Sequence, residues 1–250
     1  MTPENLQAVE PPSRGIGELE RIPGVFFEPT KTFEDIARRP SWLIPLILLI
    51  VVSMASSFAI SQKIGWERIV RQQVESSSRA QQIPPEQRER QIEMGVKMAS
   101  IFAYAGALVG APIGSLVIAG VLLGIVAGIM SAAVRFKQVF AVVCWSSLPN
   151  AIKTILLIAV VYLKNPDDFN IKNALAFNVG AFLDPEKTSK FLHSIATSLD
   201  LFTIWVILLI AVGLKAAAGK KLSFAGALIA VALPWAVIVF AGATLSGIFG

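Results

Sequence analysis

Residues 98–134 read MASIFAYAGALVGAPIGSLVIAGVLLGIVAGIMSAAV, without one charged side chain. A helix of this length would extend about 55 Å, well beyond the roughly 30 Å of a bilayer's hydrocarbon core. The uncharged stretches 40–62 and 222–250 are also long enough to cross a bilayer. A soluble chain of this size could not enclose several helices that are apolar on every side, so the pattern predicts a membrane protein.

The composition of the chain agrees with this prediction. Only 16% of the 250 residues are charged and 54% are hydrophobic, and the mean hydropathy is +0.66. A soluble domain carries about a quarter charged residues. We therefore predict an all-α fold, a polytopic membrane helix bundle with five transmembrane helices. The spans are expected at about 42–61, 98–133, 138–163, 196–218 and 222–248, after a flexible polar tail over 1–23, so that 24–250 form the transmembrane domain.

Two of the predicted spans have unusual lengths. The second is too long for one simple crossing: either one bent helix projects from the membrane, or Pro112 and Gly114 break it into a hairpin. We favour the bent helix, because each arm of a hairpin would be short. The fourth is too short, since the uncharged run between Asp200 and Lys215 spans only about 21 Å of helix. Asp200 is therefore expected inside the membrane or at its edge.

The short connections between spans set the predicted orientation. They carry Arg135, Lys137, Lys215, Lys220 and Lys221 and no acidic residue. Because positive charge near helix ends is retained in the cytoplasm, we expect a cytoplasmic N-terminus and a C-terminus outside. A hairpin in the second span would invert every later assignment.

Glycines are repeated along the second span. They form two triplets with four-residue spacing, and each triplet lies on one helix face: Gly106, Gly110 and Gly114, then Gly120, Gly124 and Gly128. Such faces let neighbouring helices approach closely and gain van der Waals contact in lipid. We predict helix packing there, with other spans of the same chain favoured over self-association.

A second set of candidate residues is polar and lies within the spans. Asn150 and Lys153 belong to the third span, and Asp200 lies near the same side of the fourth. A lysine in a span is costly and usually pairs or faces water, so we expect a candidate polar site with a Lys153–Asp200 pair. The alternatives are that Lys153 extends to the interface and that Asp200 only starts a helix.

Residue sets for catalysis are absent from the sequence. His193 is the only histidine, and neither a metal-ligand set nor a nucleophile–histidine–acid set forms around it. There is no glycine-rich phosphate loop, and the basic residues lack interleaved aromatics for nucleic-acid binding. We therefore predict no enzyme, no cofactor, no metal, no catalytic residue and no nucleic-acid partner.

The order of several short motifs resembles the Yip1 domain family of five-span membrane proteins, in a bacterial form. The resemblance covers about residues 24–245 and rests on FEPTKTF at 27–33, WSSLP at 145–149, LDLFTIW at 199–205, GLK at 213–215 and LS at 222–223. It implies a five-helix fold with a cytoplasmic N-terminus and, in the bacterial form, a place in the bacterial inner membrane. Eukaryotic members are linked to vesicle traffic and prenylated small GTPases, but this sequence lacks their Asp-Leu-Tyr-Gly-Pro stretch, so that role is not carried over.

Three functions fit these features. The first is a non-enzymatic scaffold or accessory subunit of a membrane complex, in membrane organisation or trafficking, whose partners are the lipid bilayer and either other membrane proteins or a second copy. The second is a transporter or channel component with Asn150, Lys153 and Asp200 at a midplane site. The third is membrane shaping or lipid binding by the amphipathic segments outside the spans.

Overall fold

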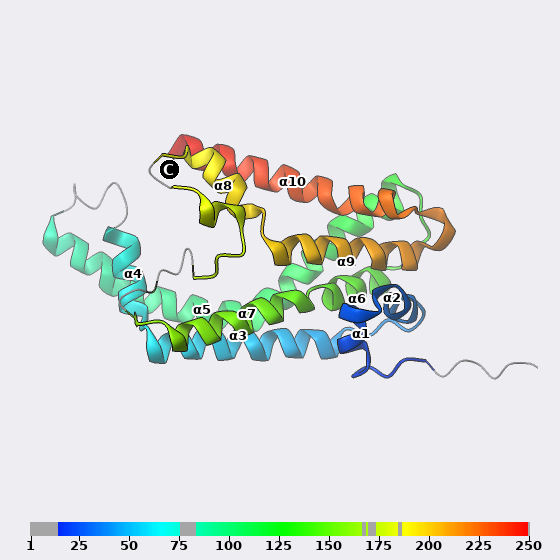
Figure 1. Cartoon of the computed structure of the whole chain (residues 1–250), viewed down its shortest axis with the longest axis horizontal. Helices are drawn as coiled ribbons and strands as arrows, with labels where there is room; N and C mark the ends of the chain where they lie inside the picture. The colour runs from blue at the N-terminus through cyan, green and yellow to red at the C-terminus, as the bar shows by residue number, and fades with distance from the viewer. Residues whose placement is uncertain (1–14, 76–83, 167–168, 170–173, 185–186, 250) are drawn as a thin grey trace, which may run out of the picture.

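The computed structural model describes residues 15–75, 84–166, 169, 174–184 and 187–249. These residues form a bundle in which five helical segments are long and apolar enough to cross a membrane, which confirms the predicted fold class. The described ends of the chain lie at opposite ends of the bundle (Figure 1). The spanning segments are α3 (Leu43–Lys63), α5 (Pro85–Leu123) with the π-helix η2 (Gly124–Ile129), α6 (Phe136–Ser146) with α7 (Leu148–Leu163), α9 (Leu201–Ala218) and α10 (Phe224–Phe249).

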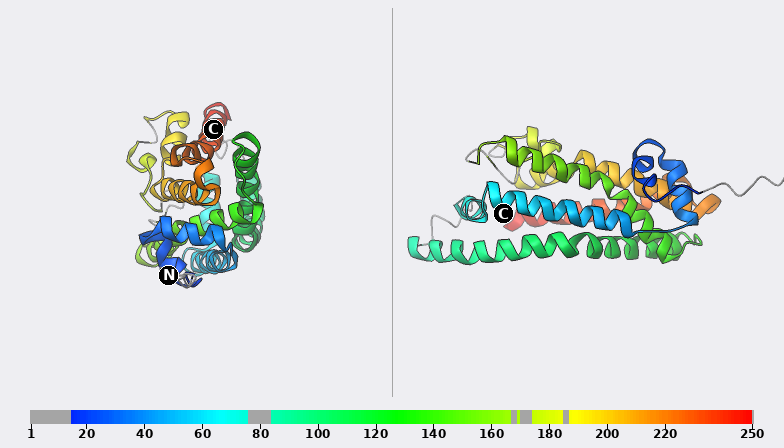
Figure 2. Two further views of the ribbon diagram at one scale, coloured as in Figure 1. Left: turned by 90° about the vertical axis from the view of Figure 1, so that its right-hand side faces the viewer. Right: turned by 90° about the horizontal axis from the view of Figure 1, so that it is seen from below.

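The long second span is one continuous helix, so the hairpin alternative is wrong. Helix α5 runs through Pro112, and Figure 2 shows no reversal of the chain along it. It starts at Pro85, earlier than predicted, where proline fits a first helical turn because its missing N–H would have no helical acceptor. It ends through η2, and Ser131 then takes a left-handed φ of 54°.

The third span is broken near its middle. Helix α6 ends at Ser146, and α7 begins at Leu148 with Pro149 in its first turn. Proline cannot donate a backbone hydrogen bond, which explains the interruption at this point. All residues from Val139 to Ser146 are buried, so α6 is the central helix of the hydrophobic core.

The fourth span begins later than predicted. Residues 190–198 form a separate helix, α8 (Lys190–Ser198), and α9 starts only at Leu201. The Asp200 carboxylate accepts hydrogen bonds from the backbone N–H groups of Phe202 and Thr203, which is the ordinary geometry of an N-cap. The predicted start at 196 was wrong because this local capping outweighs the apolar character of the preceding residues.

The chain before the first span packs on the end of the bundle. Helices α1 (Arg21–Phe27) and α2 (Pro29–Arg38) lie beside α6 and α9 (Figure 1). Phe33 and Ile36 of α2 are fully buried, so its apolar face is covered by protein. Arg21 is also buried, so the packed region includes a residue of the predicted tail; residues 1–14 lie outside the described part of the chain.

Short helices cover the opposite end of the bundle. Helix α4 (Trp66–Glu75) packs on α5, as the helical spacing of its apolar residues indicates. The 3₁₀ turn η5 (Val179–Phe182) and α8 pack together, and α8 lies along α10. The two ends therefore differ: α1 and α2 cover one, and α4, η5 and α8 cover the other.

Candidate functional site

Lys153 of α7 and Asp200 at the start of α9 are brought together. The Lys153 ammonium donates a hydrogen bond to Asp200 Oδ2 over 2.9 Å. The lysine side chain is 37% exposed, whereas that of Asp200 is 7% exposed. The contact is the one considered from the sequence, and it joins two spans within the apolar part of the bundle.

The second oxygen of Asp200 is also occupied. Asp200 Oδ1 accepts from the backbone N–H of Phe202 at 3.0 Å and of Thr203 at 3.2 Å. A carboxylate at a helix N-terminus is further stabilised by the helix dipole. The segment around Phe177 completes the environment, since its carbonyl accepts from the backbone N–H of Leu201. With both oxygens satisfied by protein, Asp200 primarily holds α9 to α7.

Asn150, the third predicted residue, does not contact this pair but lies in a groove of about 290 Å³ between spans. We call this the lateral groove; its walls come from four spans and include Val117 and Val121 of α5, Asn150 of α7, Thr203 and Ile207 of α9, and Pro234 and Trp235 of α10. Thr203 lies next to both the groove and the ion pair, because it lines the groove and its backbone N–H donates a hydrogen bond to Asp200 Oδ1. The three residues predicted as one polar site therefore lie in two places: Lys153 and Asp200 form an ion pair, and Asn150 lines the lateral groove.

The six glycines of the second span face away from the bundle. A Cβ built on any one of Gly106, Gly110, Gly114, Gly120, Gly124 and Gly128 would meet nothing within 4 Å. At about 100° per residue all six fall within an arc of about 120°, opposite the buried residues Ser115, Ala119, Leu122 and Val126. Among the described residues no other span reaches these six glycines, although Val117 on the same arc lines the lateral groove. The favoured intramolecular packing is therefore not found at the glycines themselves.

Branched side chains share the glycine face. Ile113 and Val117 project from the same arc and are 54% and 61% exposed. Of the most apolar window of this span 22% is buried, against 39% for α3 and for α9 and 17% for α10, so α5 and α10 are the two most exposed of the five spanning segments. We refer to the six glycines with Ile113 and Val117 as the α5 face, and in the end-on view of Figure 2 this helix lies at the edge of the bundle.

A buried charge cluster near the N-terminus was missed in the sequence. Arg21 of α1 donates to Asp35 Oδ2 of α2 from both Nε and Nη2, and its Nη1 donates to Ser41 Oγ. Arg39 pairs with the other oxygen of Asp35. Burial raises the pKa of Asp35, but the hydrogen bonds from Arg39 and Arg21 and their charges together hold it below its usual value.

Two hydrogen bonds tie the same segment to α6. Trp145 Nε1 donates to the carbonyl of Ser41 at 2.8 Å, and Gln138 Nε2 donates to the carbonyl of Ala37 at 2.9 Å. Asp35 is buried, but at about 100° per residue it lies about 160° from Phe33 and about 100° from Ile36, so the apolar periodicity of α2 did not indicate the cluster. We call Arg21, Asp35 and Arg39 the N-terminal clamp.

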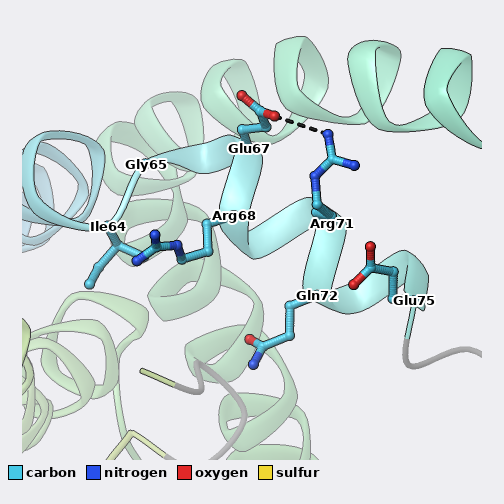
Figure 3. A pocket seen from close by; sticks show the side chains of 7 residues that line it. All are labelled: Ile64, Gly65, Glu67, Arg68, Arg71, Gln72 and Glu75. Atoms are coloured by element: carbon cyan, nitrogen blue, oxygen red, sulfur yellow. Dashed lines mark hydrogen bonds and ion pairs between the residues drawn. The ribbon is translucent and has the colours of Figure 1, made fainter. Parts of the chain in front are cut away.

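A hollow of about 830 Å³ beside α4 is lined by charged residues of one helix and the turn before it (Figure 3). Arg71 points toward Glu67 in this view and also pairs with Glu89 of α5 at 2.9 Å. The Arg71–Glu89 pair joins α4 to α5, and the Arg71–Glu67 pair lies within α4. In the described ranges no group of three or more His, Cys, Asp or Glu could hold a metal ion.

Comparison with known proteins gives one result. The model of the Yip1 domain matches residues 24–245, nearly the whole chain. The match includes the N-terminal clamp from Asp35 onward, the Lys153–Asp200 pair and the α5 face. Searches of curated proteins and of solved structures gave no match.

Proposed function

The chain belongs to the Yip1 domain family and is an integral membrane protein, and from this premise we propose that it is a non-enzymatic scaffold or accessory subunit. Its docking surface is the α5 face. A transmembrane helix of another membrane protein would lie against this face and hold the two proteins together in the bilayer. The observation that carries the proposal is the open space above all six glycines.

The open space is informative because this chain also contains an occupied glycine. A Cβ on Gly213 of α9 would lie 2.9 Å from Phe33 Cδ1 and closer still to Val142 Cγ1, so two helices press onto that position. The α5 glycines have the same lack of a side chain but no neighbour. In lipid, where helix association depends on close van der Waals packing, such a surface supports docking by another helix.

The chemistry of the face specifies the kind of partner. It contains no charged side chain from residue 98 to the end of η2, and its exposed Ile113 and Val117 are apolar. A soluble protein could not reach this part of the helix through the hydrocarbon core. The partner proposed is therefore a membrane protein that presents a helix with small or branched side chains.

The test compares α5 variants in native membranes. The full chain with an affinity tag is cross-linked and purified, and the partners that are retained are identified by mass spectrometry. Gly110→Leu and Gly124→Leu should each remove the partners without lowering the abundance of the protein, because none of the described residues lies within 4 Å of a Cβ at either position. Ala105→Leu, at an exposed position outside the glycine arc, should leave them in place.

The outcomes separate three cases. If both glycine variants retain every partner that the parent chain retains, the scaffold proposal is overturned. If two differently tagged copies co-purify and Gly110→Leu separates them, the occupant of the face is a second copy of this chain. If a different membrane protein is lost, the accessory role stands.

A transport role is favoured by one observation only, the amide of Asn150 in the lateral groove. No described residue makes a hydrogen bond with that amide, so it could bind a polar group passing through the bilayer. The Asn150→Leu protein, compared with the parent in planar bilayers, should then lose ion conductance at unchanged abundance. Lys153 is a less specific probe, because its replacement also unpairs Asp200.

A further inference from the structure

The end of the bundle that carries α2 contains a cavity of about 1120 Å³. Its walls come from α2, the connection before α6, the end of α9 and the start of α10. The charged residues that line it are Glu34, Arg38, Arg135, Lys215 and Lys220. We call this cavity the basic pocket, since four of these five side chains are cationic.

Most of the positive charge in the basic pocket is not neutralised by the part of the chain that the structure describes. Glu34, the one carboxylate among the lining residues, lies 3.5 Å from Arg38 and pairs with it. Arg135, Lys215 and Lys220 form no ion pair with the residues that the structure describes. All three are exposed and therefore accessible to an anion that enters the pocket.

The position of the pocket along the spans places it at the level of lipid headgroups. Arg135 directly precedes the third span, and Lys215 lies in the last turn of α9. Lys220 belongs to the short turn η6 (Gly219–Lys221) between the fourth and fifth spans. Val212, about one turn further into the span than Lys215, and Phe224 at the start of α10 also line the pocket, so apolar side chains lie beside its cations.

The turn between α9 and α10 brings the two lysines to the same cavity. Gly219 has φ 62°, in the left-handed region that residues with a Cβ rarely adopt, and it lets the chain leave α9 abruptly. Ser223 then caps α10, accepting from the backbone N–H of Gly226. Ser223 and Phe224 at this helix start line the same pocket as the two lysines, so the positive end of the α10 dipole adds to its potential.

We propose that the basic pocket binds the phosphate headgroup of an anionic phospholipid from the leaflet that it faces. Cationic pockets between spans attract such headgroups, and each Lys or Arg near the surface strengthens binding about fivefold. The volume is slightly above the usual range of small-molecule sites, which leaves room for a glycerol phosphate with water. The apolar side of the pocket, with Val212 and Phe224, accommodates the first part of the acyl chains.

The test uses the purified full chain in a neutral detergent, with bound lipids counted by native mass spectrometry. Phosphatidylglycerol is added in competition with phosphatidylcholine of the same chain length. The parent protein should retain phosphatidylglycerol selectively. The Arg135→Gln/Lys215→Gln/Lys220→Gln protein should bind phosphatidylglycerol at least tenfold more weakly than the parent. This threshold is lower than the loss expected if each of the three charges contributed about fivefold independently.

A matched control removes three lysines at the other end of the bundle. Lys63→Gln/Lys97→Gln/Lys164→Gln changes the net charge equally, and these residues form no ion pair with described residues. This protein should keep the selectivity of the parent. Thermal unfolding of each variant reports whether the fold is intact. If the triple pocket variant is unfolded, Lys220→Gln alone decides, with an expected loss of about fivefold.

Three outcomes would overturn the proposal. The first is equal retention of phosphatidylglycerol by the pocket variant and the parent. The second is equal retention of the two lipids by the parent protein. The third is displacement of the lipid by glycerol 3-phosphate at an equal concentration, which would show that the pocket takes a soluble phosphate rather than a membrane lipid.

Discussion

Arg21 donates two hydrogen bonds to one oxygen of Asp35, from Nε at 2.9 Å and from Nη2 at 2.7 Å. The two side chains are 3% and 12% exposed, so the pair is enclosed by protein. It joins α1 to α2 and lies beside Trp145, whose indole bonds to the Ser41 carbonyl. The clamp therefore fixes the segment before the first span to α6, the central helix of the bundle.

Removing the arginine of this pair should destabilise the docked N-terminal helices. Arg21→Ala leaves the buried Asp35 carboxylate with only Arg39, and the expected cost is about 3 kcal/mol. Hydrogen exchange of the α2 amides should report this loss directly. Arg38→Ala is the control. Both side chains of the Arg38–Glu34 pair are exposed, so the pair should contribute at most about 1 kcal/mol to the free energy of unfolding. Equal effects of the two substitutions would show that Arg21 does not hold the helices.

The clamp should also respond to acid. Because the pKa of Asp35 is lower in the folded chain than in the unfolded one, its contribution to stability is complete above the unfolded pKa of about 3.9 and is lost as pH falls through the folded pKa. Protection of the α2 amides, corrected for intrinsic exchange, should be constant from about pH 7 to about pH 5 and should fall below about pH 4. Asp35→Asn should lower protection at neutral pH and remove this acid-dependent part. An unchanged acid response in Asp35→Asn would assign it to another group.

The pairing of Lys153 with Asp200 makes a separate prediction for the bundle core. Asp200→Asn keeps an acceptor for the N-cap but leaves the lysine unpaired, and Lys153→Met leaves the carboxylate unpaired. Each should cost about 1–3 kcal/mol, below the value for a fully buried pair because Lys153 is partly exposed. The double variant should be more stable than the sum of the two losses indicates. Strictly additive losses in denaturant titrations would show that the contact contributes no stability.

Long uncharged runs were enough to predict most of the fold, because crossing a bilayer imposes a length on each helix. The predicted and observed bounds of α3 and α10 agree closely for this reason. The start of α9 was mispredicted because it depends on the Asp200 cap and on the contact with Lys153, which is distant in the sequence. Arg21 was missed because one basic residue in a polar stretch shows no periodicity before its partner on α2 is known.

The candidate sites were predictable to different degrees. Lysine and aspartate near the same side of adjacent spans indicated the Lys153–Asp200 contact, since charges in lipid need a partner. The glycine spacing indicated a packing face, but spacing alone does not specify which neighbour occupies it. Only the position of Ser115 and Ala119 on the buried side of α5 shows that the glycines point outward.

The orientation of the bundle follows from its charged connections and remains a prediction. Arg135, Lys215 and Lys220 gather at the end that carries α1 and α2, so this end should lie in the cytoplasm. A reporter that is active only outside the cytoplasm, fused after Gly250, should be active. The same reporter fused within the connection before α6, next to Arg135, should be inactive. The reverse pattern would place the basic pocket in the outer leaflet.

Gly213 provides the final prediction, on packing between α9, α6 and α2. A methyl group there would lie 2.9 Å from Phe33 Cδ1 and in closer conflict with Val142 Cγ1, so neighbours in the densest part of the core would have to move. Gly213→Ala should therefore destabilise the protein by about 1–3 kcal/mol, although alanine favours a helix by up to about 1 kcal/mol.

Two further variants make this prediction specific. Val142→Ala removes the methyl groups in conflict, so the Gly213→Ala/Val142→Ala protein should lose less stability than the two single losses added together. Gly110→Ala is the control: its methyl group would meet no atom within 4 Å in the described part of the chain, and only the helix preference of alanine should remain, giving equal or slightly higher stability. Thermal unfolding in detergent measures all four proteins. If Gly213→Ala matches Gly110→Ala, then α9 does not approach α6 as closely as the structure shows, and the contrast between occupied and open glycines that supports docking on α5 would no longer hold.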